Sequence, residues 1–447
     1  MNFQSNRAAG TASRHLTGAL FCAYLLLIVI EYLGLSAQLP LLKLTRFPTL
    51  LAYGLVAATM VLGGWRVAVG SAQGRLLLLF LVFTGSTVLW ALVRTHVATD
   101  LRAHIDYMGL FASTAFLLDR HARVRALAVV VSLMVIVLVA ANIDNLISEV
   151  RAGAFRAGYF LADGNDFGWG LVVLLPFPLY LALQRSLLLR PLGAMAGAAA
   201  LAGIVGTGSR GATLAVAAAG LYYWLAVSRR KALGAVALVV VAAAVLLLAP
   251  GSYVDRMRTI GDYEEDSSAQ GRLRAWKAAV SMAVDHPLGV GAGNFNSAYG
   301  RFYLPAEHGW GMRRWISAHS VYFKVLGEYG FPGLLLLAVI IWTCLRDNRR
   351  VLRWQAGGQG LDTWPAMVNM GVVGYSVAGL FLGGVAYPHL YILSGLTVSC
   401  RRLAEGVTET ETAPAPTAIL APQSHPRERI PVASIAARRT TTATKAA

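Results

Sequence analysis

The feature that most constrains the fold is a series of long apolar runs that recurs along most of the chain. A helix that crosses a lipid bilayer needs about 20 mostly apolar residues, and windows of this kind recur from near Leu16 to near Ser399. Hydrophobic residues make up 56% of the 447 positions and charged residues only 14%, which is unlike a soluble domain. We therefore predict an all-α integral membrane protein, a helical bundle solvated by lipid.

The boundaries of the apolar runs predict about twelve transmembrane helices. The first run is too long for a signal-peptide core and lacks a small-residue cleavage site, so we expect it to be retained. The predicted spans are 16–35, 48–64, 76–93, 104–118, 126–147, 166–184, 192–207, 211–227, 232–249, 331–346, 363–384 and 386–400.

The basic residues predict the orientation of these spans. A net charge of +17 could indicate nucleic-acid binding, but Lys and Arg in membrane proteins gather in cytoplasmic loops. With the N-terminus inside, the predicted inner loops carry clusters such as Arg229, Arg230 and Lys231, whereas the short outer loops are poorer in basic residues. We therefore expect both termini in the cytoplasm, membrane lipids around the bundle and no nucleic-acid partner.

Four regions follow from this topology. Residues 1–249 hold the first nine spans, and residues 331–402 hold the last three. Between them, residues 250–330 form a large outward loop with a helical lid and the candidate catalytic residues; its part 250–318 is mixed in charge and rich in Trp and Tyr. Residues 403–447 turn to Thr, Ala and Pro, a composition that predicts a disordered cytoplasmic tail.

One amphipathic helix is predicted inside the outward loop. Ser267 and Gln270 have the spacing of a capping box. Apolar side chains then recur at helical intervals, at Leu273, Trp276, Val280 and Val284. We expect this helix to lie at the membrane interface and to end before Pro287.

Arginines on the outward side are candidates for binding a phosphate group. Arg210 lies between two apolar runs, where a charge is costly unless it has a function, although it could instead anchor a helix end. Arg272 and Arg274 begin the predicted amphipathic helix, and Arg272 precedes Trp276 by four residues. The planar, permanently charged guanidinium suits phosphate, and a helix start adds free amides. The alternative for this pair is a solvated interfacial helix with basic flanks.

His319 opens another predicted helix, in the segment SAHSVYFKVLGEYGFPGLLLL. An imidazole that titrates near neutral pH can accept a proton from a sugar hydroxyl, as a general base must. The alternative is a structural histidine. Gly330 and Pro332 predict a break between this short helix and the next span.

A polar cluster precedes the sixth span, at Arg156, Asp163, Asn165 and Asp166. These side chains could hold a sugar or position Arg156. The alternative is an Asn/Asp-rich turn that caps the helix.

The chemistry predicted for these residues needs neither a metal nor a cofactor. The chain has no Walker motif, no HExxH and no carboxylate cluster for a divalent cation, and the glycines of PLGVGAGNF follow no strand. An outward-facing enzyme has no nucleotide supply, so its donor must arrive already activated, as a polyprenyl diphosphate sugar does. Arginines would neutralise the leaving diphosphate, and the histidine would activate the acceptor hydroxyl.

Three segments in order resemble the O-antigen ligase superfamily, namely SRGATLAVA, GRLRAWKAAVSMAVDHPLGVGAGNF and AHSVYFKVLGEYGFPGLL. The resemblance covers about residues 150–345 and implies a GT-C-like helical glycosyltransferase of the bacterial inner membrane. It would transfer glycan from undecaprenyl diphosphate with inversion and without metal, with Arg210, Arg272 and His319 at the functional positions. Ser320 stands where many members have asparagine.

The leading hypothesis is an O-antigen ligase that uses the lipid A-core oligosaccharide as acceptor at the periplasmic face. An O-antigen or exopolysaccharide polymerase, or an O-glycosylation ligase, would use the same donor with another acceptor, and the residues above do not separate them. A polysaccharide flippase or a scaffold would leave the gathering of polar residues on one face unexplained.

Overall fold

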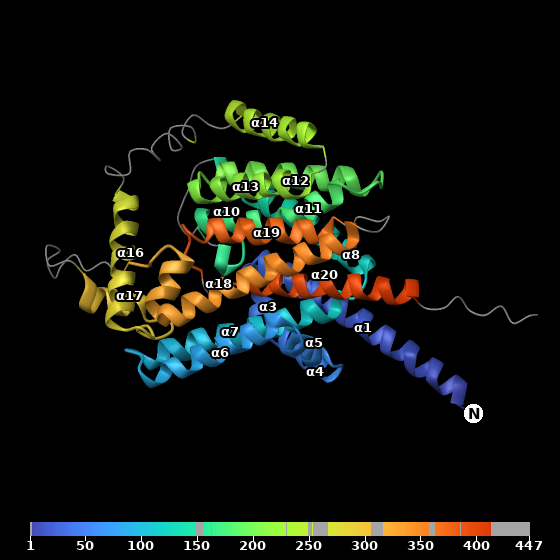
Figure 1. Cartoon of the computed structure of the whole chain (residues 1–447), viewed down its shortest axis with the longest axis horizontal. Helices are drawn as coiled ribbons and strands as arrows, with labels where there is room; N and C mark the ends of the chain where they lie inside the picture. The colour runs from blue at the N-terminus through green and yellow to red at the C-terminus, as the bar shows by residue number, and fades with distance from the viewer. Residues whose placement is uncertain are drawn as a thin grey trace, which may run out of the picture. The chain divides into compact units, whose positions relative to one another are not determined.

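The computed structural model describes residues 2–147, 155–161, 163–228, 230–248, 253, 267–304, 316–356, 363–384 and 386–412. Within these ranges every regular element is a helix, which confirms the predicted all-α class. The chain divides into a large unit, residues 1–406, and a second unit from residue 407 onward. The packing and the site described below lie in the large unit, where many of the long helices run side by side (Figure 1).

The first half of the chain contains α1 (Asn2–Tyr32), α2 (Leu35–Gln38), α3 (Pro40–Leu44), α4 (Phe47–Val61), α5 (Gly64–Gly70), α6 (Ala72–Ser86), η1 (Thr87–Leu89), α7 (Arg94–Leu117), α8 (His121–Ala141), α9 (Ile143–Ile147), η2 (Tyr159–Leu161), α10 (Gly164–Leu174), α11 (Pro176–Ala182), α12 (Leu189–Gly206) and α13 (Arg210–Tyr222). The second half contains η3 (Tyr223–Val227), α14 (Lys231–Leu248), α16 (Ser267–Asp285), α17 (Phe295–Ala298), η4 (Tyr299–Tyr303), α18 (Val321–Ala356), α19 (Trp364–Ala378) and α20 (Pro388–Thr412).

Six helical segments in the described ranges are long and apolar enough to cross a membrane, or seven if a bent pair counts as one span. The bent pair is α4 with α5, which meet at 78°. Helices also form where spans 211–227 and 363–384 were predicted, but α13 and α19 have only 13 and 15 residues. The protein is therefore a multi-span helical bundle, and the count of twelve spans stays a prediction.

Small residues allow α10, α11 and α12 to pack closely, and this packing fixes the position of α10. A Cβ added to Gly193 of α12 would come within 2.4 Å of the Pro178 carbonyl oxygen on α11. A Cβ on Gly203 would lie 2.6 Å from a methyl carbon of Leu171 on α10. Such close approach between helices is the usual way to gain dispersion energy inside a bilayer, where apolar side chains gain nothing by leaving lipid.

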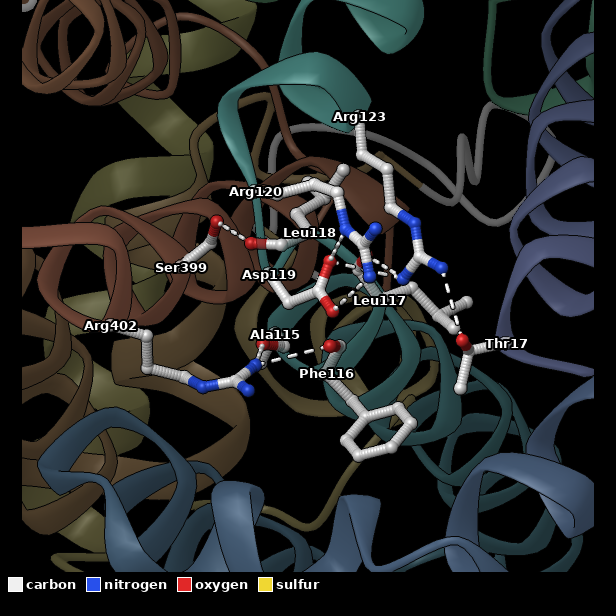
Figure 2. A network of polar contacts seen from close by, with 10 residues as sticks. All are labelled: Thr17, Ala115, Phe116, Leu117, Leu118, Asp119, Arg120, Arg123, Ser399 and Arg402. Carbon is white, nitrogen blue, oxygen red and sulfur yellow. Dashed lines mark hydrogen bonds and ion pairs between the residues drawn. The ribbon is translucent and has the colours of Figure 1, made fainter. Parts of the chain in front are cut away.

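The C-terminal end of α7 is fixed by arginines that cap its last carbonyl groups (Figure 2). Arg402 of α20 donates to the carbonyl oxygens of Ala115 and Phe116, at 2.6 and 3.1 Å. Arg123 of α8 donates to the carbonyl oxygen of Leu117 at 2.9 Å and to Thr17 of α1 at 3.1 Å. The final turn of a helix has no intrahelical donors for its carbonyls. Side chains of α1, α8 and α20 therefore hold α7 at this end.

The outward loop contains the predicted helix, but that helix buries a different face. Helix α16 begins at Ser267 and ends at Asp285, before Pro287, and it packs against α18 (Figure 1). Val280 and Val284 are 46% and 64% exposed, so this part of the apolar face does not pack against the protein, and its place at the membrane interface stays a prediction. The buried face carries small side chains and one methionine, at Ala275, Ala278, Ala279, Met282 and Ala283. These mostly small side chains allow α16 to pack closely against α18.

Helix α18 is broken where the sequence predicted. Gly330 has φ 63° and ψ −160°, which is not helical, and Pro332 follows it. A side chain at position 330 would collide with the Pro287 carbonyl oxygen, so the break also packs against the segment after α16. At the other end of the chain α20 continues to Thr412, beyond the predicted start of the tail at residue 403. Residues 413–447 of that tail and the side chain of Ser267 lie outside the described residues.

Candidate active site

His319 lies in a strained turn immediately before α18. Its φ of 45° is in the left-handed region, which costs about 1 kcal/mol or more for a residue with a side chain. Neighbouring hydrogen bonds hold this turn: the Val321 amide donates to the Gly379 carbonyl at 2.8 Å, and the Ser320 hydroxyl donates to the same carbonyl at 3.3 Å. The backbone after α19 thus fixes an exposed imidazole at the start of α18.

Ser320 also caps α18. Its Oγ accepts from the amide of Phe323 at 3.5 Å, a long bond in the position of a helix N-cap. Serine and asparagine are both favoured at N-caps because their side-chain oxygens accept from the first free amides of a helix. The change from the asparagine of many superfamily members therefore keeps the local role of this residue.

Helix α16 is joined to the His319 turn by one tryptophan. Trp276 donates from Nε1 to the Ala318 carbonyl at 2.9 Å and stacks on Phe323 with ring centroids 4.7 Å apart. Arg272 lies one turn earlier on α16, and its charge acts on His319. The surrounding protein lowers the pKa of His319 below its ordinary value, Arg272 lowers it further, and Asp163 raises it. These effects keep the imidazole in its neutral, proton-accepting form at pH 7.

The start of α10 lies opposite His319. Asp163 is the N-cap of this helix, and its Oδ1 accepts from the amides of Asn165 and Asp166, each at 2.8 Å. Asp166 accepts from the Tyr387 hydroxyl at 3.0 Å. The helix cap that was the alternative interpretation of Asp163 is therefore confirmed. The cap does not remove this cluster from the site, because all three polar residues line a cavity.

This cavity brings together four of the residues singled out in the sequence. It has a volume of about 240 Å³ and is lined by His319, Asp163, Asn165 and Asp166, with Ser317, Lys324, Leu382, Gly383, Gly384, Ala386 and Tyr387. A Cβ on Gly383 would lie 3.4 Å from the backbone of His319. No described residue of α16 lines the cavity. Helix α16, the predicted lid, therefore influences the site through Trp276 and Arg272 and does not line the cavity.

The candidate arginines occupy different positions. Arg210 begins α13 and is half-buried, and Gly211 beside it packs against Phe381, next to the cavity wall at Leu382. Arg274 is exposed and acts on another group: burial raises the pKa of Tyr299, and the Arg274 guanidinium lowers it.

Arg156 is not part of this cavity. It is exposed on the segment 155–161, where its amide donates to the Asn142 side chain at 2.6 Å. The structure thus connects Arg272 with His319 and places Arg210 at the start of a helix whose Gly211 packs against Phe381, whereas Arg274 and Arg156 have other neighbours.

Lys324 was not singled out in the sequence. It lines the same cavity as His319, and its charge acts on Asp100 of α7. A lysine within an apolar helix next to a membrane span is a signal for function. Glu328 stands four residues later, however, and that spacing is also typical of an ordinary intrahelical pair.

The comparison with protein families concerns the part of the chain that carries these groups. Residues 195–338, about a third of the chain, match the family model described as O-antigen ligase. This match supports the O-antigen ligase superfamily. The matched segment contains Arg210, Arg272 and His319, and the resemblance drawn from the three motifs is confirmed. The O-antigen ligase match does not include Asp163, Asn165 and Asp166, which come from the preceding helix. A search of curated proteins found no match to the chain.

Proposed function

We propose that the protein is a glycosyltransferase that moves a glycan from undecaprenyl diphosphate to the lipid A-core oligosaccharide, as an O-antigen ligase. The observation that carries this proposal is the position of His319, which lines a polar cavity and interacts with Arg272 within an O-antigen ligase match. An exposed general base next to a fixed cation is the pair that transfer from a diphosphate donor needs.

The reaction follows from the roles of these groups. His319 accepts the proton of the acceptor hydroxyl, and the oxygen of that hydroxyl forms a bond to the anomeric carbon of the donor glycan. The bond between that carbon and the diphosphate oxygen breaks, and undecaprenyl diphosphate leaves with the electron pair. A single displacement of this kind inverts the anomeric centre.

The cations around the cavity have one common task in this reaction. Arg272 acts directly on His319, and Arg210 begins the helix beside the cavity wall. Both would bind the diphosphate and stabilise the charge that builds on it in the transition state. Lys324, on the cavity surface, adds a third positive group.

The polar residues of α10 would bind the sugar. Asp163 uses one carboxylate oxygen to cap the helix, which holds Asn165 and Asp166 in fixed positions on the cavity wall. Amide and carboxylate groups are suited to hydrogen bonding with sugar hydroxyls. A fixed sugar orients its anomeric carbon toward the acceptor and lowers the entropic cost of the reaction.

The proposed orientation places the cavity toward the periplasm and both termini in the cytoplasm. Helix α7 supports this orientation. Its end at Leu117 is surrounded by Arg120, Arg123 and Arg402, a basic cluster typical of the inner side. Near its other end Asp100 interacts with Lys324, which lines the cavity.

The proposal is tested by reconstitution. The purified protein, undecaprenyl diphosphate glycan and rough lipopolysaccharide are incubated in liposomes with a chelator, and the products are separated on a gel. Capped lipopolysaccharide in a ladder pattern is the expected result. Elongated undecaprenyl-linked glycan in its place would identify a polymerase, and a requirement for added divalent metal would contradict the metal-independent mechanism.

The diphosphate site is tested by donor binding. Arg272→Ala and Arg210→Ala should each weaken binding of the donor roughly tenfold to a hundredfold, since a hydrogen bond to a charged group contributes about 1.5–3 kcal/mol. Lys277→Ala is the matched control, because Lys277 is an exposed cation on the same helix as Arg272. Unchanged affinity in both arginine variants would remove them from the diphosphate site.

A further inference from the structure

We propose that a groove along one face of α7 receives the acceptor as an intact glycolipid, with its oligosaccharide at the outward end and its acyl chains at the end near Leu110. The inference rests on the proposed function and deepens it, because it assigns the acceptor a binding site of its own, apart from the donor cavity at His319.

Two cavities that meet on α7 form the groove. The first has a volume of about 610 Å³ and lies between the start of α7 and the segment 293–301, which includes α17. The second has a volume of about 280 Å³ and lies between α7, α1 and α4. Thr99 lines both. The α7 residues that line them recur every three or four positions, at His96, Thr99, Ala103, Asp106 and Leu110, so one face of the helix follows the whole groove.

The lining changes from polar to apolar along this face. The outward cavity is surrounded by hydrogen-bonding side chains, at His96, Asp100, Asn296, Ser297 and Arg301. The inner end has an aliphatic floor of Leu27, Ile28, Ala52 and Leu110. Between them stand tyrosines, at positions 53, 107 and 159, and the hydroxyls of Tyr107 and Tyr159 are hydrogen-bonded to each other. Tyrosine is typical of the boundary between head groups and hydrocarbon, so the gradient matches a lipid with a sugar head group.

The length of the second cavity along α7 matches one leaflet of a bilayer. Thr99 and Leu110 are about 16 Å apart along α7 at about 1.5 Å per residue. Half of a hydrocarbon core about 30 Å thick is about 15 Å. A head group beside Thr99 would therefore lie at the membrane surface while the acyl chains reach the aliphatic floor and the lipid beyond it.

The charges of the groove favour a sugar over a second diphosphate. Its lining holds three acidic residues, Glu31, Asp100 and Asp106, and three basic or imidazole residues, His96, Arg102 and Arg301. A second diphosphate would need an excess of cations, and the lining of the groove has none. Sugar hydroxyls both donate and accept hydrogen bonds, so they can pair with carboxylate and guanidinium groups alike.

One electrostatic interaction connects a residue of the outward cavity with a residue of the donor cavity. Asp100 lines the outward cavity, and its carboxylate interacts with Lys324, which lines the cavity of His319. Oδ2 of Asp100 is buried and accepts no hydrogen bond from the described part of the chain. A terminal acceptor sugar beside Asp100 would stand next to the base that must remove its proton.

A bulky side chain at the junction of the two cavities tests the proposal. Thr99 is exposed and its hydroxyl bonds only within its own helix, so Thr99→Trp should fold and block the groove. Ala98→Trp is the matched control, because Ala98 is exposed but lies about 100° away around the helix, outside the groove. Binding of rough lipopolysaccharide and of undecaprenyl diphosphate glycan is measured separately on detergent-solubilised protein.

Thr99→Trp should weaken binding of rough lipopolysaccharide by about tenfold or more, or about 1.4 kcal/mol, with donor affinity unchanged. Ala98→Trp should bind both lipids as the wild type does. Equal binding of lipopolysaccharide by the two variants, or a parallel loss of donor affinity in Thr99→Trp, would overturn the groove as the acceptor site. Binding is measured without turnover. A wild-type protein that binds rough lipopolysaccharide, loses this binding in Thr99→Trp and yet transfers no glycan would refute the proposed function and still support the groove as a glycolipid site.

Discussion

Trp276 offers a way to move Arg272 without changing any group that is proposed to touch the substrate. Its indole donates one hydrogen bond to the Ala318 carbonyl and stacks on Phe323, and these contacts join α16 to the turn that holds His319. Trp276→Phe keeps a ring for the stack and removes the hydrogen bond. Trp276→Ala removes both.

The expected losses follow from these two contacts. A hydrogen bond contributes about 1 kcal/mol, so Trp276→Phe should lower kcat/KM about fivefold if all of that energy is expressed in the transition state. The stacked pair adds about 0.5–1.5 kcal/mol beyond its burial. Trp276 is half-buried, and the two contacts together contribute about 1.5–2.5 kcal/mol, so Trp276→Ala should lower kcat/KM roughly tenfold to seventyfold.

The assay is the initial rate of glycan transfer as a function of pH. A merely structural loss would lower the rate equally at every pH. Because Arg272 lowers the pKa of His319, withdrawal of α16 should raise that pKa and move the acid limb of the profile to higher pH. Trp354→Phe is the control, since Trp354 is 58% exposed at the far end of α18.

Two results would refute this reasoning. If Trp276→Phe and Trp276→Ala transferred glycan at the wild-type rate, α16 would have no part in positioning the site. If both lowered the rate while the acid limb stayed in place, Trp276 would act on stability alone and not through Arg272.

Three further predictions concern single residues. Activity should persist below pH 6.5, the ordinary pKa of a histidine, and fall only as the pH drops through the lowered pKa of His319. Arg272→Gln should move this acid limb of the profile to higher pH. An unshifted profile would contradict the interaction of Arg272 with His319. Ser320→Asn should keep its helix cap, whereas Ser320→Ala should cost about 1 kcal/mol in unfolding experiments, and equal loss in both would refute the cap. Arg402→Met should leave the carbonyls of Ala115 and Phe116 without a donor and cost about 1–3 kcal/mol in thermal unfolding, whereas unchanged stability would show that water replaces the arginine.

The sequence was sufficient for the features that depend on local pattern. Apolar runs predict helices because a span needs a continuous stretch of apolar residues, and the helical class is confirmed. The limits of α16 and the break at Gly330 were also predictable, because proline and glycine restrict the backbone wherever they occur.

Features that depend on contacts between distant segments were not predictable. The apolar pattern of α16 did not show which of its faces packs against α18, which is the alanine face and not the one with Val280 and Val284. Glu328, four positions later, has the largest electrostatic effect on Lys324, but Lys324 also interacts with Asp100, which is more than two hundred positions away in the sequence. No local periodicity connects Lys324 with Asp100. The strain at His319 is likewise imposed by the Gly379 carbonyl, from the segment after α19.

Transfer by a His319→Asn variant is the most direct test of the proposed mechanism. Asparagine tolerates the left-handed backbone of this position better than alanine does, so the turn should persist while the base is lost. With undecaprenyl diphosphate glycan and rough lipopolysaccharide in liposomes, the variant should bind the donor as the wild type does and form no capped product. Transfer by His319→Asn at the wild-type rate would contradict the assignment of His319 as the general base and the site built around it.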